Sequence, residues 1–114
     1  MSSVTWIKDI HSSDMVGVPV TGDTDAESFV NVANKPEIVL SGEFQGIDPG
    51  NTTKASIKIY HFNTVNNSYG YTGVELEFLH EGQTFQLVES PGTPVAFVAD
   101  VVGADSFVLT VGTK

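Results

Sequence analysis

Residues 74–89 carry the clearest structural signal in this chain, because apolar and polar side chains alternate along them. The apolar positions are Val74, Leu76, Phe78, Phe85 and Leu87. A period of two places such a set on one face of a strand and the intervening glutamates on the other. The stretch therefore predicts a β-hairpin with one dry face and one wet face, turning near Glu81 and Gly82, where glycine can adopt a positive φ.

Further apolar runs separated by turn-forming residues extend the same pattern over the chain. These runs cover residues 4–8, 16–20, 28–32, 36–44, 54–62, 95–102 and 106–111. Asp48-Pro49-Gly50-Asn51 is typical of a type II turn, because proline presets the first φ and glycine accepts the positive second one, and Pro91-Gly92 repeats this chemistry. The pattern predicts an all-β, single-domain antiparallel β-sandwich or jelly-roll-like barrel of about eight or nine short strands over residues 1–114.

The N-terminal third is less regular than the rest. Residues 1–15 are interpreted as an N-terminal arm or an edge strand, and deleting residues 1–10 is expected to leave the fold largely intact. Pro19 removes a ladder donor and confines its own segment to a sheet edge. A short helix around residues 25–29, capped by Asp23 or Thr24, is the alternative to a strand over residues 28–32.

Composition excludes several classes of partner and site. The 114 residues contain 14 carboxylates against five lysines and no arginine, for a net charge of −9, so nucleic acid is not an expected partner. No cysteine is available for disulfides or zinc–thiolate sites. No secretion signal and no apolar run of membrane-spanning length are present in the sequence, so we expect a cytoplasmic protein with no membrane partner.

Candidate metal and catalytic groups do not assemble into a recognisable motif. Asp23, Asp25 and Glu27 alternate as in hard-cation loops, but Ser28 stands where an EF-hand requires glycine, so a solvated acidic turn is the prediction. The three histidines have no metal-ligand spacing, and no Gly-x-Ser-x-Gly elbow occurs. Glu75 and Glu77 share the polar face of one strand. We therefore expect no enzyme activity, no catalytic residue, no metal and no cofactor.

Several apolar residues have no obvious place in a two-layer core. In the C-terminal strands, Val98, Val102 and Val108 add apolar bulk to the face opposite the core residues, and such a face needs a second cover. The sequence predicts that a homo-oligomer, a dimer or trimer, covers it. The docking segment toward a larger partner is predicted at the N-terminus, with Trp6, Ile7 and Ile10.

The size, the acidic cysteine-free composition and the strand pattern of most of the chain resemble those of the small β-rich accessory proteins that decorate or cement the capsids of tailed phages. The resemblance implies a non-enzymatic structural protein of the virion, made in a host cytoplasm and docked on repeated sites of the shell. The alternative is a small carbohydrate-binding β-sandwich, in which Tyr69 and Tyr71, on one face of a strand, stack on sugars together with Trp6 and Tyr60.

Overall fold

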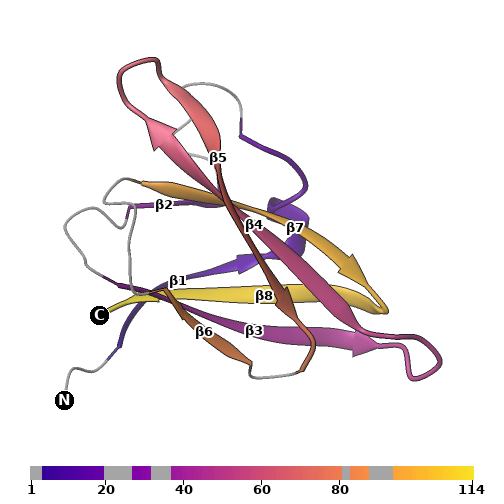
Figure 1. Cartoon of the computed structure of the whole chain (residues 1–114). Coiled ribbons are helices and arrows are strands. Elements are labelled where there is room, and N and C mark those ends of the chain that lie inside the picture. Colours follow the sequence, from indigo (N-terminus) through magenta and orange to yellow (C-terminus); the bar gives the residue numbers. More distant parts are fainter. Residues whose placement is uncertain (1–3, 20–26, 32–36, 81–82, 88–93) are drawn as a thin grey trace.

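Two four-stranded antiparallel sheets pack face to face in the computed structural model of this protein (Figure 1), which describes residues 4–19, 27–31, 37–80, 83–87 and 94–114. The first sheet has the order β1 (Thr5–His11), β8 (Ala104–Thr113), β3 (Ile38–Ile47) and β6 (Thr84–Leu87). The second sheet has the order β2 (Phe29–Val30), β7 (Val95–Val102), β4 (Lys54–Asn63) and β5 (Ser68–Phe78). The predicted all-β sandwich is confirmed.

The only helical element in the described part of the chain is a 3-10 turn, η1 (Ser12–Asp14), which follows β1 directly. Residues 27 and 28 form a turn before β2, and residues 16–19 contain no strand, so the strand predicted over residues 16–20 is wrong for its described part. None of the helical structure described is long and apolar enough to span a membrane.

The core lies between the sheets and is built from the inward-facing residues that the period of two selects. Three aromatic rings from different strands meet in it: Phe78 of β5 lies 4.9 Å from Phe85 of β6 and 5.1 Å from Phe107 of β8, between ring centroids. Gly42 of β3 faces the rings of Phe78 and Phe107 so closely that a Cβ atom there would overlap both. The buried cluster comprises Ile10, Met15, Val30, Ile38, Leu40, Phe44, Ala55, Ile57, Ile59, Phe78, Val95, Phe97, Phe107, Leu109 and Val111.

The hairpin predicted over residues 74–89 is wrong, although both of its arms are strands. β5 pairs with β4 in the second sheet, whereas β6 pairs with β3 in the first. The chain therefore crosses from one sheet to the other between these strands. Alternation along a strand shows which residues face the core, but it does not show which sheet the strand belongs to. Two strands in opposite sheets of a sandwich therefore show the same alternation as the two arms of a hairpin.

Among the strands that the structure describes, only β4 and β5 are consecutive strands paired as a hairpin in one sheet. Their register runs from Ala55 opposite Phe78 to Asn63 opposite Ser68, with a bulge after Lys58. Asn67 in the loop has a φ of 56°, a left-handed conformation that asparagine tolerates. In Figure 1 this hairpin crosses over the strands of the first sheet, and its loop extends beyond them.

The turn at residues 48–51 joins β3 to β4, in opposite sheets, and its predicted type is wrong. Gly50 does not adopt the positive φ that a type II turn requires, whereas Gly46, Gly73 and Gly103 have positive φ. The amide of Asn51 donates to the carbonyl of Asp48 at 3.2 Å, and the Asp48 carboxylate accepts the amide of Gly50 at 2.9 Å. The aspartate side chain thus stabilises a turn without left-handed glycine. The second Pro-Gly pair, at residues 91–92, lies outside the described residues.

Residues 5–11 form the edge strand β1, which pairs with β8 on both sides of a bulge at Ile7, so the N-terminal segment is not a detachable arm. Ile10 is 1% exposed and packs in the core, and the carbonyl of Met15 accepts the amide of Ala99 in β7 at 2.8 Å. The segment therefore contacts both sheets. Deleting residues 1–10 would remove a strand and a core side chain, which contradicts the expectation that the fold tolerates this deletion.

Candidate binding surfaces

The six residues predicted to form a partner interface lie in four separate places. Ile10 is buried in the core and cannot take part in docking, so its assignment to the docking surface is wrong. Trp6 and Ile7 lie on β1, at the edge of the first sheet, with Trp6 50% and Ile7 46% exposed. The remaining three residues lie on the outer faces of the two sheets.

Among the large exposed apolar side chains of the described residues, only Trp6 and Ile7 are consecutive in the sequence; we call this pair the β1 edge patch. Trp6 is opposite Gly112 of β8, and its ring lies against the backbone of that glycine on the outer face of the first sheet. A bulge between Trp6 and Lys8 leaves Ile7 without a register partner. Bulges at sheet edges redirect side chains, and here two apolar side chains reach solvent.

The three C-terminal valines do not form one apolar surface. Val98 and Val102 lie on the outer face of the second sheet, in register with Lys58 and Lys54, respectively. Val108 lies on the outer face of the first sheet, between His11 and Glu43. Because the outer faces of the two sheets are opposite sides of the sandwich, one contact cannot cover Val98 and Val108 of the same copy. Each of these valines lies beside charged or polar side chains, so none of them requires a second protein surface to cover it.

An aromatic row crosses the outer face of the second sheet. Tyr60 of β4 is opposite Tyr71 of β5, with ring centroids 5.4 Å apart and ring planes 40° apart. The next row pairs Phe62 with Tyr69 at 5.1 Å, and Phe29 of β2 lies 6.2 Å from Phe62. The predicted sharing of a face by Tyr69 and Tyr71 thus holds, because both pair with β4 residues of the outer face.

Beside this row, the same face is hollowed into a polar groove of about 310 Å³, lined by Lys54, Ser56, Lys58, Glu75, Glu77, Val98, Ala99 and Asp100. Lys54 approaches Glu77 at 3.8 Å and Lys58 approaches Glu75 at 3.9 Å, between nitrogen and oxygen. The Lys58 ammonium also lies 5.8 Å from the centroid of the Tyr71 ring. The sequence indicated Glu75 and Glu77 as a solvated face, but the two lysines that approach them are brought there only by the pairing of β4 with β5.

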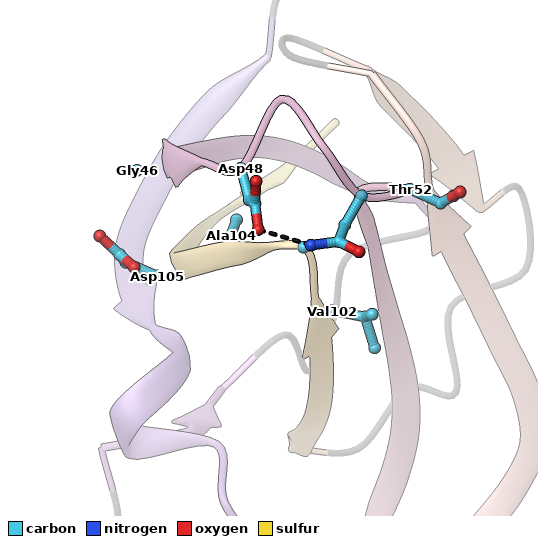
Figure 2. Close-up of a pocket in the computed structure, with 8 residues that line it drawn as sticks. Gly46, Asp48, Thr52, Val102, Ala104 and Asp105 are labelled. Carbon is cyan, nitrogen blue, oxygen red and sulfur yellow. Dashed lines mark hydrogen bonds between the residues drawn. The ribbon is translucent and has the colours of Figure 1, made fainter.

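A second hollow lies where the β3–β4 turn meets the β7–β8 connection (Figure 2). Asp48 and Asp105 are at its rim, and Figure 2 shows the Asp105 carboxylate pointing away from that of Asp48. The hydrogen bond from the Gly50 amide, followed by the one from the Asn51 side chain, lowers the pKa of Asp48 below its ordinary value of 3.8. These partners assign Asp48 to the turn, because its oxygens accept hydrogen bonds within that turn.

Asp48→Ala should lower the melting temperature modestly at pH 7, because it removes the two hydrogen-bond acceptors of the turn. A carboxylate whose pKa is lowered by folding stabilises the protein at any pH above its pKa in the unfolded state. This contribution disappears as the pH falls through its pKa in the folded state. The difference between wild type and Asp48→Ala should therefore shrink below pH 3.8. Thermal melts followed by circular dichroism from pH 7 to pH 2 test this, with Glu43→Ala as the control for net charge. A difference that stays constant on acidification would contradict it.

The candidate cation loop is described only at its end. Asp23 and Asp25 lie outside the described residues, and Glu27 is 4.0 Å from the Lys8 ammonium. Across the parts of the chain with described positions, no three His, Asp or Glu side chains come together as metal ligands would. His11 is exposed at the end of β1, and His80 is exposed in the segment that follows β5. His61 on β4 is half-buried opposite Val95.

Comparison with protein-family models, curated proteins and solved structures finds no match to this chain.

Proposed function

We propose that this protein is a non-enzymatic structural protein that acts by surface contact, as a homo-oligomer docked on a larger protein assembly such as the capsid shell of a phage. The sequence resemblance to virion accessory proteins supports the kind of partner, and with it a location in the virion. The β1 edge patch carries the proposal for the contact surface, because Trp6 and Ile7 are adjacent and half exposed on an edge strand.

The chemistry of the β1 edge patch suits a protein partner. Tryptophan is enriched among the residues that contribute most to protein–protein binding, because its large ring removes much apolar surface from water while its N–H can still donate. A strand edge also offers backbone groups to a further strand. Among the described strands, β1 pairs with β8 alone, so its other edge faces away from the first sheet.

The position of the β1 edge patch also fits a contact between copies of this chain. Residues that follow it along β1 are fixed by pairing with β8 and by the burial of Ile10, so the patch is held rigidly on the sandwich. A rigid contact surface loses less conformational entropy on binding than a loose tail does. A symmetric oligomer buries the β1 edge patch of every copy against a neighbouring copy. The assembled oligomer then presents its remaining surface once per copy, so several weak contacts with a lattice add to a strong attachment.

The double substitution Trp6→Asp and Ile7→Asp should dissociate the oligomer. Burying two carboxylates in an apolar contact costs several kcal/mol. Size-exclusion chromatography with light scattering at micromolar concentration measures the mass of each variant, with a protomer of 12.2 kDa as the reference. We expect an oligomeric wild type and a monomeric double variant.

Val65→Asp is the matched control, because Val65 is 95% exposed at the tip of the β4–β5 hairpin, away from β1. It adds a carboxylate in place of an exposed apolar side chain without touching the β1 edge patch and should leave the mass unchanged. A wild-type protein that remains a monomer at this concentration would sink the proposed homo-oligomer. Dissociation by Val65→Asp alone would place the contact on the hairpin instead.

A further inference from the structure

We propose that the outer face of the second sheet binds a neutral oligosaccharide, with Tyr71 and Tyr60 as the stacking platform and the adjacent groove as the polar subsite. This surface is independent of the β1 edge patch, which lies on the first sheet. The platform contains fewer aromatic residues than the sequence predicted for sugar binding. Trp6 is on the other sheet, and Tyr69 packs on Phe62, so the exposed ring of the platform is Tyr71, at 49% exposure.

The platform has the properties that sugar stacking requires. The C–H groups of a sugar ring carry partial positive charge, and the face of an aromatic ring carries partial negative charge, so the two attract over a broad apolar contact. Tyr71 is backed by Tyr60, whose ring lies 5.4 Å away on the neighbouring strand. Both rings stand on paired strands rather than loops, which keeps them in position before a ligand arrives.

The groove next to the platform supplies hydrogen-bonding groups at the spacing of paired strands. Lys58 is opposite Glu75, one row of side chains along from the Tyr60–Tyr71 row, and Ser56 is opposite Glu77 in the next row. The nitrogen–oxygen distances of 3.8 and 3.9 Å in the two ion pairs are longer than hydrogen bonds. Half-exposed pairs of this kind contribute little to stability, so sugar hydroxyls can donate to these carboxylates and accept from these ammonium groups at little cost.

The charge of the groove selects a neutral ligand. Two lysines and three carboxylates line it, in a chain whose net charge is −9. An anionic ligand, such as a sulfated or uronic-acid polysaccharide, would be repelled by this balance, because the carboxylates outnumber the ammonium groups. A neutral oligosaccharide can bind both the ammonium donors and the carboxylate acceptors of the groove through its hydroxyl groups, and it brings no charge of its own. The groove volume of about 310 Å³ falls at the lower end of ordinary ligand pockets.

Native affinity electrophoresis tests the proposal with defined probes. Gels containing hydroxyethylcellulose, mixed-linkage β-glucan, galactomannan, dextran or soluble starch are compared with a gel without polysaccharide and with one containing alginate, a polyanion. We expect retardation of the wild type in at least one neutral polysaccharide and none in alginate. Tyr71→Ala should raise the apparent dissociation constant for that polysaccharide about tenfold or more, because it truncates a central aromatic contact. Tyr71→Phe should keep it, because stacking needs the ring and not the hydroxyl.

Two controls separate this site from the rest of the molecule. Ile47→Ala should leave the retardation unchanged, since Ile47 is exposed on β3 of the first sheet and lies outside the β1 edge patch. Circular dichroism should show that Tyr71→Ala is folded. Mobility that falls equally in the gel without polysaccharide reflects self-association and counts against a sugar site. Absence of retardation in all five neutral polysaccharides, retardation in alginate, or full retention by a folded Tyr71→Ala variant would overturn the proposal.

Discussion

Phe78→Ala should destabilise the folded protein by about 3–5 kcal/mol, the loss seen when a large aromatic side chain is removed from a packed core. Phe78 is fully buried, and its ring contacts Phe85 and Phe107 at centroid distances of 4.9 and 5.1 Å. These three residues belong to β5, β6 and β8, so the ring joins both sheets. Removing it leaves a cavity that rigid strands cannot close and loses contacts on two sides at once.

Urea denaturation followed by circular dichroism measures this effect as a lower transition midpoint at an unchanged slope. A single domain of this size has a total stability of about 5–15 kcal/mol, so the variant should be close to unfolding. Leu79→Ala is the matched control, because the neighbouring Leu79 is 46% exposed and should change stability by no more than about 0.5 kcal/mol. Equal losses for Phe78→Ala and Leu79→Ala would mean that Phe78 does not join the two sheets.

Gly103→Ala should destabilise the protein by roughly 2–6 kcal/mol, through two separate costs. Gly103 is the single residue between β7 and β8, where the chain passes from the second sheet to the first. Its φ of 76° costs about 1–3 kcal/mol for a residue with a side chain. In addition, a Cβ atom would lie 2.2 Å from the backbone carbonyl oxygen of Thr52, and displacing that backbone adds about 1–3 kcal/mol.

The neighbourhood of Gly103 also explains why a shift there is costly. The Gly103 carbonyl accepts the amide of Asp48 at 2.9 Å and the hydroxyl of Thr53 at 3.2 Å, so it ties the β7–β8 connection to the β3–β4 turn. Gly70→Ala is the matched control, because a Cβ atom at Gly70 meets nothing within 4 Å and its φ is not positive. A melting temperature for Gly103→Ala equal to that of Gly70→Ala would contradict this account.

Alternation along single strands was enough to predict the fold class, because it records directly which side chains avoid water. Ile57 and Ile59 on β4, and Phe107 and Leu109 on β8, are buried as their period of two requires. The candidate surfaces were predicted only in part. Trp6 and Ile7 are exposed as expected, whereas Ile10 is in the core, because the bulge between Trp6 and Lys8 changes the phase of β1 and no sequence signal marks this bulge.

The sequence by itself determined the all-β class, the strand positions in the C-terminal two thirds and the sharing of one face by Tyr69 and Tyr71. Tertiary structure decided which strands pair. The links β3–β4, β5–β6 and β7–β8 each cross between sheets, and β4–β5 is the single hairpin among the described strands. Local sequence cannot distinguish these cases, because one core receives inward-facing side chains from both sheets. The same pairing places Lys58 beside Glu75 and Tyr60 beside Tyr71, so the groove and its aromatic platform exist only once β4 and β5 are in register.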